Sequence, residues 1–515
     1  MIKGYENNLW IKRRIDMNTF MNNLAESTNF NRTANGALAH KSTRSMVYDM
    51  FALGGAYRGR SVEDCVNLFK NALEENEELA LKCLFYLRDC RGGQGERRYF
   101  RECFKWLCGT HPEIAKRLLI YVSEYGRWDD LIYSTFDTAL FKDAMVIIKH
   151  QLALDVECKT PSLLAKWMPS ENASAIRTKR VANAVRRYLG MTHKQYRKTL
   201  SILRARINVL ERLMSANRWD EIEFDKIPSK AGLIYKNAFA RRDIIAKKYE
   251  TFAKSSDTKV NAKTLFPYDV VYQATNNTSM WGCESHFNRI PEVDRAMINK
   301  YWENLPNYLN GNPCKMLCVI DTSASMVRSH LGAASPINVA ISLGMYCAER
   351  VEGAFKNQYI SFSGSPQLIK VEGVDFVDKV RRIYETNLCA NTNIEATFDL
   401  LMRAAKDANP EDIPETIVII SDMQIDRMTT GWWTESQTAT EMERIRKRWE
   451  INGLKMPRLV YWNVNASNDT ILDNGPDVSF VSGCSPVIFE QIVTGVTGYD
   501  LMLKKLMTER YAAIA

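Results

Sequence analysis

The chain has 515 residues, 46% of them apolar and 25% charged, which is typical of a soluble globular protein of two or three domains. No apolar run reaches the roughly 18 residues that a membrane-spanning helix needs. Residues 1–24 mix charged residues with Asn and lack the apolar core of a signal peptide. The twelve Cys include no pair of Cys-x-x-Cys units with zinc-site spacing. We therefore expect a cytoplasmic protein with reduced thiols and no membrane anchor.

The net charge of +9 is unevenly distributed along the chain. Residues 1–300 carry 49 Lys and Arg against 34 Asp and Glu, whereas residues 301–515 carry 20 against 26. Most of the excess lies in residues 151–250, with 21 basic and 10 acidic residues. A positive segment followed by a slightly acidic one indicates that the first half binds a polyanion and that the second half has a different task.

The first half of the chain has a helical pattern. Residues 1–45 are polar and rich in Asn, so we expect an arm with little fixed structure. From residue 46 to about 254, apolar residues recur at three- and four-residue spacing, which predicts many helices joined by short turns. The string from Arg127 to Leu131 returns as Arg218 to Ile222, a spacing of about two HEAT-type units. An all-α helical-repeat domain is predicted over residues 46–310, although the pattern within 255–310 assigns no element.

The hydrophobic pattern of the sequence changes at about residue 311, where short apolar runs begin to alternate with helical patterns. We expect strands at 315–320, 358–363, 416–421, 458–464 and 477–482, and helices at 337–352, 394–408, 438–450 and 485–494. Such alternation implies a mostly parallel sheet with helices on both faces. Residues 311–515 are therefore predicted to form a doubly wound α/β domain.

Polar side chains follow two of these strands. The predicted metal ligands are Asp321, Ser323 and Ser325 after the first strand and Asp422 after the strand at 416–421. Open α/β sheets bind ligands at the carboxyl ends of their strands. A set made only of oxygens suits Mg²⁺ or another hard divalent cation. The alternative is that these residues form ordinary turns whose hydroxyls stabilise the loops.

A second distinctive string runs from Arg88 to Arg98. Glycines at 92, 93 and 95 interrupt the helical pattern, and Arg residues stand on both sides. Backbone N–H groups of such a loop, together with Arg, can bind phosphate. A tight turn between helices, with Arg–carboxylate pairs, is the alternative.

The Gly-Gly-Gln-Gly-Glu-Arg loop starting at Gly92, the string Gly126 to Asp130 and the segment Pro228 to Ala231, with the Asp-x-Ser-x-Ser motif, resemble the DUF2828 and TROVE-related proteins. That group includes the Ro RNA-binding proteins. The resemblance covers roughly residues 45–500 and implies a HEAT-like helical domain, ring-shaped in the Ro group, followed by a von Willebrand factor A (vWA) domain. It also implies that the four predicted metal ligands, with Thr392 just before the predicted helix at 394–408 as the fifth ligand, form a metal-ion-dependent adhesion site (MIDAS). One departure is the third loop, where the usual Asp-Gly is Asp422-Met423 and a further acid, Asp426, follows.

In the Ro group a basic surface of the ring binds structured RNA and the central hole takes single-stranded ends. The resemblance therefore implies a monomeric RNA-binding protein whose MIDAS recruits an acidic partner. Tyr188 and Tyr196 are candidate stacking faces. The candidate RNA-contacting residues are Arg88, Arg91, Arg97, Arg98, Lys179, Arg180, Arg186, Arg187, Lys194, Arg197 and Lys198.

Two other functions compete with RNA binding. The first is an interaction scaffold that binds protein partners through Mg²⁺ and no nucleic acid. The second is a metal-dependent hydrolase, which we rank lowest because the chain shows no P-loop, no nucleophile elbow and no paired carboxylates beside a His. We expect no enzyme activity.

Overall fold

The structure is a computed structural model that describes residues 21, 24, 25, 28–275, 287, 289–309, 314–327, 332–386, 392–426, 440–473 and 475–514. Most of the segment 1–27 and part of 255–310 lie outside these residues. No helix within the described ranges is long and apolar enough to cross a membrane. The ten Cys that the structure describes are all free thiols, as expected.

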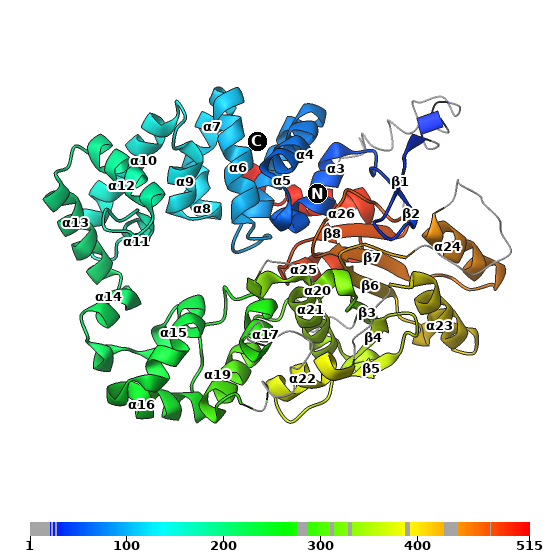
Figure 1. Ribbon diagram of the computed structural model, residues 1–515. Coiled ribbons are helices and arrows are strands. Elements are labelled where there is room, and N and C mark those ends of the chain that lie inside the picture. Colours follow the sequence, from blue (N-terminus) through cyan, green and yellow to red (C-terminus); the bar gives the residue numbers. More distant parts are fainter. Residues whose placement is uncertain are drawn as a thin grey trace.

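The first half of the chain is helical, as predicted, and its helices follow one another as an arc (Figure 1). Local sequence explains several helix starts: Ser61 and Asp64 form a capping box at the start of the helix Val62–Glu75, and Thr192 and Gln195 form another at the start of His193–Arg206. The helices are α3 (Met46–Leu53), α4 (Val62–Glu75), α5 (Glu77–Arg88), α6 (Arg97–Thr110), α7 (Pro112–Leu118), α8 (Val122–Tyr125), α9 (Trp128–Thr135), α10 (Phe141–Glu157), α11 (Leu164–Trp167), α12 (Ile176–Tyr188), α13 (His193–Arg206), α14 (Leu210–Ser215), α15 (Ser229–Arg241), α16 (Asp243–Lys254), α17 (Pro267–Thr275) and α19 (Glu292–Glu303).

The two similar strings, Arg127 to Leu131 and Arg218 to Ile222, do not form a structural repeat. Trp128 begins the α-helix α9, whereas Trp219 begins a 3-10 turn of three residues. The Trp219 side chain is buried, and its indole N–H donates to Asn217. The indole of Trp219 is therefore committed to packing.

The two ends of the arc meet each other. Arg58, which follows α3, donates to Glu96 (2.9 Å) and lies over the ring of Tyr268 in α17. Gly95, with φ +72°, is so close to Phe266 that an added Cβ would be 3.0 Å from the ring. Both ends also pack on the α/β domain, α3 against β8 (Val478–Ser482) and α17 against α21 (Pro336–Arg350). The helical arc is thus closed near α17.

The second half forms a six-stranded sheet in the order β5-β4-β3-β6-β7-β8, parallel except for the edge strand β5. The strands are β3 (Met316–Asp321), β4 (Gln358–Phe362), β5 (Leu368–Lys370), β6 (Thr416–Ser421), β7 (Arg458–Asn463) and β8 (Val478–Ser482). The helices are α20 (Ala324–Val327), α21 (Pro336–Arg350), α22 (Phe376–Thr386), α23 (Ile394–Lys406), α24 (Glu441–Ile451), α25 (Ile488–Ile492) and α26 (Gly498–Leu506). The predicted doubly wound α/β fold is confirmed. The sequence did not predict β5, α20, α22 or α26.

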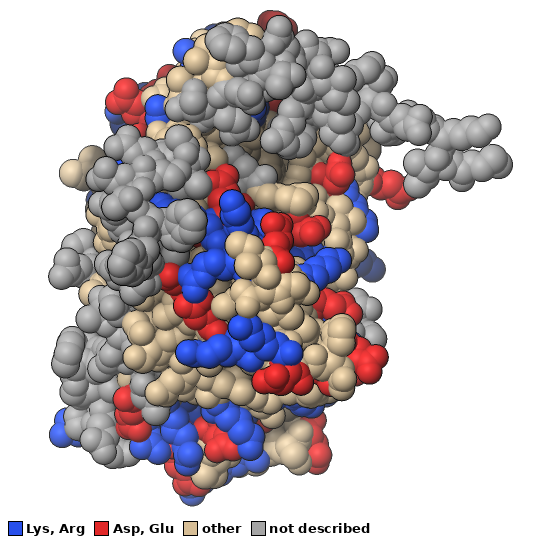
Figure 2. Space-filling view, turned by 90° about the vertical axis from the view of Figure 1, so that its right-hand side faces the viewer, with Lys and Arg blue, Asp and Glu red and all other residues tan. Residues whose placement is uncertain are grey.

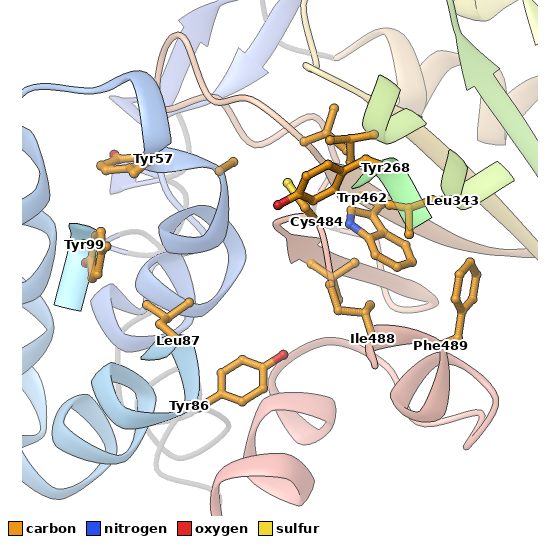
Figure 3. Packing of buried hydrophobic residues seen from close by; sticks show 14 of the residues in the cluster. Tyr57, Tyr86, Leu87, Tyr99, Tyr268, Leu343, Trp462, Cys484, Ile488 and Phe489 are labelled. Carbon is orange, nitrogen blue, oxygen red and sulfur yellow. The ribbon is translucent and has the colours of Figure 1, made fainter. Parts of the chain in front are cut away.

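One hydrophobic core runs through both halves (Figure 3). The phenol oxygen of Tyr86 in α5 accepts hydrogen bonds from Gln94 (2.7 Å) and from Gln491 of α25 (2.9 Å). Gly55, after α3, is so close to the backbone of Ser482 that an added Cβ would lie 2.6 Å from its carbonyl oxygen. The helical half and the α/β half therefore share a tightly packed interface.

The N-terminal segment differs from the expected unstructured arm. From residue 28 on it is ordered: β1 (Phe30–Arg32) and β2 (Leu38–His40) form an antiparallel hairpin, and His40 pairs with Ile471 of the α/β domain. Its polar side chains bond to residues about 390 positions later in the chain. Local sequence alone does not reveal partners at that separation.

Candidate metal centre and basic surface

The predicted metal ligands gather at the point where the strand order reverses. β3 and β6 are adjacent parallel strands, paired from Met316 with Thr416 to Ile320 with Ile420. From β3 the chain proceeds to β4 on one side, and from β6 it proceeds to β7 on the other. Asp321 and Asp422 therefore lie at neighbouring carboxyl ends of the sheet, at the switch point that binds ligands in folds of this kind.

Short hydrogen bonds fix the first loop against the third. The Asp321 carboxylate accepts from the backbone N–H of Ser323 (2.8 Å) and from the hydroxyl of Ser421 (2.5 Å). The hydroxyls of Ser323 and Ser325 are 3.0 Å apart, and Ser325 also bonds to Asp422. Four of the five predicted ligands are thus brought together.

The electrostatics of this cluster favour a cation. Asp321 is fully buried and Asp422 is 2% exposed. Burial, followed by the charge of Asp321, raises the pKa of Asp422 to about 7, and burial also raises the pKa of Asp321. Neither carboxylate forms an ion pair with a Lys or Arg in the described part of the chain. A divalent cation would supply the missing counter-charge, so the residues fit such an ion.

The donor set is poor in charge. Groups of three or more His, Cys, Asp or Glu that could hold a metal do not occur among the residues that the structure describes. A cation here would need the hydroxyls of Ser323 and Ser325, as well as the carboxylates, for its coordination.

The fifth predicted ligand, Thr392, is buried beside the third loop rather than bonded to the two carboxylates. Its backbone N–H donates to Asp426 (2.7 Å), and its carbonyl accepts from the Asp426 N–H (3.1 Å). Met423, which follows Asp422, adopts φ +62°, a left-handed conformation that a residue with a side chain adopts at some cost. The third loop therefore keeps a backbone conformation suited to glycine although its residue is Met.

Sequence reasoning gave no role to two residues at this site. Ser421 holds the Asp321 carboxylate, and its hydroxyl also accepts from the Met423 N–H (2.9 Å). Gln424 donates its backbone N–H to Asp422 (3.2 Å). The signal for Ser421 was present, since a Ser directly before the Asp ends the strand next to the first loop.

The glycine-rich loop is a structural turn, which supports the alternative interpretation. Arg88 is 3% exposed and donates to the buried Asp130 at 2.8 and 2.6 Å, so the prediction that Arg88 contacts RNA is corrected. Arg91 is exposed but donates to the carbonyl of Glu124 (2.6 Å). Arg97 and Arg98 are exposed.

The C-terminal segment of the chain packs against the same glycine-rich loop. The 3-10 segment Glu509–Ile514 packs on α5, and Arg510 forms an ion pair with the buried Asp89. Tyr511 donates to Asp89 (3.0 Å) and stacks on Tyr125. A Cβ at Gly92 would be 3.0 Å from the Arg510 side chain. Because Gly92 has no side chain, the C-terminal segment can pack closely against this loop.

The basic run on α12 and α13 divides into structural and exposed residues. Arg186 is paired with Glu171 (2.9 Å), and Tyr196 is buried with its hydroxyl donating to the Pro169 carbonyl, so neither is free to contact RNA as predicted. Tyr188 is 45% exposed. The exposed basic residues among those predicted are Lys179, Arg180, Arg187, Lys194, Arg197 and Lys198.

These six side chains define what we call the basic surface. Residues 176–206 hold ten Lys and Arg and no Asp or Glu. Arg180 pairs with Asp137 at 3.2 Å on the rim. On the α/β side of the molecule, by contrast, basic and acidic residues are interspersed (Figure 2). In Figure 1 the helices α12 and α13, which carry these residues, lie at the far left of the arc, away from that side.

Comparison with known proteins places this chain in a family. It belongs to the family described as Domain of unknown function (DUF2828), whose profile matches residues 33–124 and 130–312, as predicted. A second profile, Domain of unknown function (DUF7788), matches residues 315–499. An uncharacterized protein of Acanthamoeba polyphaga mimivirus is 26% identical over 509 residues, which cover 90% of this chain and 85% of the relative. The crystal structure of the Deinococcus radiodurans Ro (RSR) protein gives a TM-score of 0.47 at 11% identity, covering 88% of this chain and 100% of that one.

Proposed function

We propose that this protein is an RNA-binding protein that also holds a divalent cation, and that it binds its partners without chemical turnover. The observation that carries the cation is the pair of buried carboxylates, Asp321 and Asp422, on adjacent strand ends without a described basic partner. Asp321, Ser323, Ser325 and Asp422 would hold Mg²⁺, and Thr392 would contribute from the second loop. The bound ion would offer a coordination position to an acidic group of a partner protein.

The basic surface supports RNA as the second ligand. Lys and Arg contacts to phosphates provide most of the non-specific affinity for nucleic acids. Tyr188 adds an exposed aromatic ring within the same run, and single-stranded RNA stacks its bases on such rings. Residues 176–206 hold ten Lys and Arg and no Asp or Glu, and binding to proteins alone would not require such a concentration of positive charge.

Calorimetric titration with Mg²⁺ tests the cation. We expect one site in the wild-type protein, and we expect it to be lost in Asp321→Ala and in Asp422→Ala. Asp407→Ala removes an exposed carboxylate after α23 and serves as the control, with wild-type binding. Equal binding by wild type and Asp321→Ala would refute the assignment.

Filter binding to single-stranded RNA over a range of salt concentrations tests the basic surface. Changing Arg187, Lys194, Arg197 and Lys198 to Ala should lower the salt slope by roughly 3, because each phosphate contact contributes about 0.7. The control changes four exposed lysines of α4, α7 and α10, namely Lys70, Lys116, Lys142 and Lys149, and should leave the slope unchanged.

The two alternative functions, a protein-interaction scaffold and a metal-dependent hydrolase, predict different results in these assays. If the wild-type protein retains no RNA at low salt, the RNA proposal fails. Capture of an acidic protein that needs Mg²⁺ and ignores nuclease would then support the interaction scaffold. Turnover of RNA that disappears in Asp422→Ala would instead indicate a hydrolase.

A further inference from the structure

The turn of the N-terminal hairpin grips the loop that carries Asp422. The Thr33 hydroxyl donates to the carbonyl of Ile425 (2.7 Å), and Gly36 forms an antiparallel bridge with Asp426. Asn35 uses both hydrogens of its amide, one to the Gln424 carbonyl (2.7 Å) and one to the Asp426 carboxylate (2.8 Å). Residues 33–36 therefore contact the third loop at several points.

Two chains of hydrogen bonds lead from this turn to the metal loops. In the first, Asp426 accepts from Asn35 with one oxygen and from the Thr392 N–H with the other (2.7 Å), so a single carboxylate joins the hairpin to the second loop. In the second, Gln424 accepts the Ala34 N–H on its side chain (2.7 Å) and donates its own N–H to Asp422. Both the second and the third loop are thus tied to the hairpin.

We propose that Asp426 is a positioning residue through which attachment of the N-terminal hairpin and cation binding strengthen each other. This inference rests on the cation site proposed above. Asp426 holds Thr392 at the level of the third loop, and the hairpin holds Asp426. If the hairpin detaches, the second loop loses one of its anchors and the oxygen ligands are less well preorganised. By linkage, a cation that needs the ordered loops must in turn favour the attached hairpin.

Mg²⁺ affinity of the full-length protein gives the first test. Partners that orient metal ligands typically change affinity 10–100-fold when they are altered, and we expect a weakening in that range for Asp426→Asn. Asn35 is exposed, so Asn35→Ala should fold normally. It should weaken Mg²⁺ binding roughly 2–10-fold, the weight of one hydrogen bond. Lys41→Ala, in the same arm, is the control and should bind as wild type does, because among the described residues the Lys41 side chain donates only to the carbonyl of Thr28.

Hydrogen exchange gives the reciprocal test, with a readout that a merely structural role would not change. In the wild-type protein, saturating Mg²⁺ should slow exchange in the peptide covering residues 33–37. In Asp426→Asn that slowing should disappear, while exchange in β6 should stay slow in both proteins.

The possible failures are separable. If the wild-type protein binds Mg²⁺ in an Asp321-dependent manner, but Asn35→Ala and Asp426→Asn keep wild-type affinity and exchange in 33–37 ignores Mg²⁺, the coupling is refuted and the cation site stands. If the wild-type protein binds no Mg²⁺, both proposals are overturned. A weaker affinity in both variants, with loss of the exchange effect, supports the coupling.

Discussion

The ion pair between Arg88 and Asp130 offers a direct test of the role assigned to the glycine-rich loop. Asp130 is fully buried and accepts from Arg88, from Arg101 (2.6 Å) and from the Arg127 backbone N–H (2.9 Å). Asp130→Ala removes all these bonds and leaves the buried guanidinium of Arg88 without its carboxylate acceptor, whereas Arg101 keeps its ion pair with Asp129. Breaking a buried pair in this way typically costs about 3–5 kcal/mol.

Urea unfolding followed by circular dichroism measures that cost. Arg88→Ala should destabilise by a similar amount because it leaves the Asp130 charge less well compensated. The two changes made together should cost less than the sum of the single changes, because they remove the same interaction. Both single variants, examined at a temperature where they remain folded, should keep the wild-type salt slope for RNA.

Either of two results would refute this reasoning. A loss below about 1 kcal/mol in both variants would show that the pair is solvated and contributes as little as a surface ion pair. A salt slope lowered in Arg88→Ala but not in Asp130→Ala would return Arg88 to the RNA-contacting residues.

Three further predictions concern stability. Tyr511→Ala should destabilise the protein by about 3–5 kcal/mol, because it removes a fully buried aromatic ring that packs beside Tyr86 and Tyr125. Tyr511→Phe removes only the hydrogen bond to Asp89 and should cost about 0.5–1.5 kcal/mol; urea unfolding measures both variants. Gly93→Ala would place a Cβ 2.0 Å from the Tyr86 carbonyl oxygen and should destabilise the protein, whereas Gly109→Ala in α6 has open space around it and should stabilise the protein by about 0.5–1 kcal/mol. Thermal unfolding compares the two variants, and equal effects would contradict the close packing around Gly93. Removing divalent ions with EDTA should lower the melting temperature of the wild-type protein but not that of Asp321→Ala, because a ligand that binds only the folded state stabilises it; scanning calorimetry decides, and equal shifts in both would speak against the site.

The α/β half was largely predictable because its signals are local. The strands β3 and β6 are short apolar runs, the first ending in Asp321 and the second ending in Ser421 directly before Asp422. Their burial on both faces explains why they form continuous hydrophobic stretches in the sequence. The grouping of Asp321 with Asp422 followed from the rule that parallel strands end at the same edge. β5 escaped notice because it is three residues long and partly exposed at the sheet edge.

The fate of individual basic and polar side chains was not predictable in the same way. Arg88 and Arg187 look alike in sequence, but the first meets a carboxylate 42 positions away and the second is exposed. Asn35 reads as a residue of a polar arm, and its partners lie some 390 positions later. Partners this distant are fixed by the fold, and the local pattern carries no trace of them.

Diffraction from crystals soaked in Mn²⁺, recorded at a wavelength where manganese scatters anomalously, tests the cation site most directly. We expect one strong anomalous peak at the carboxyl ends of β3 and β6, within bonding distance of oxygens from Ser323, Ser325 and at least one of the two Asp carboxylates. A fully soaked crystal with no peak between these loops, or with manganese bound only elsewhere, would contradict this expectation.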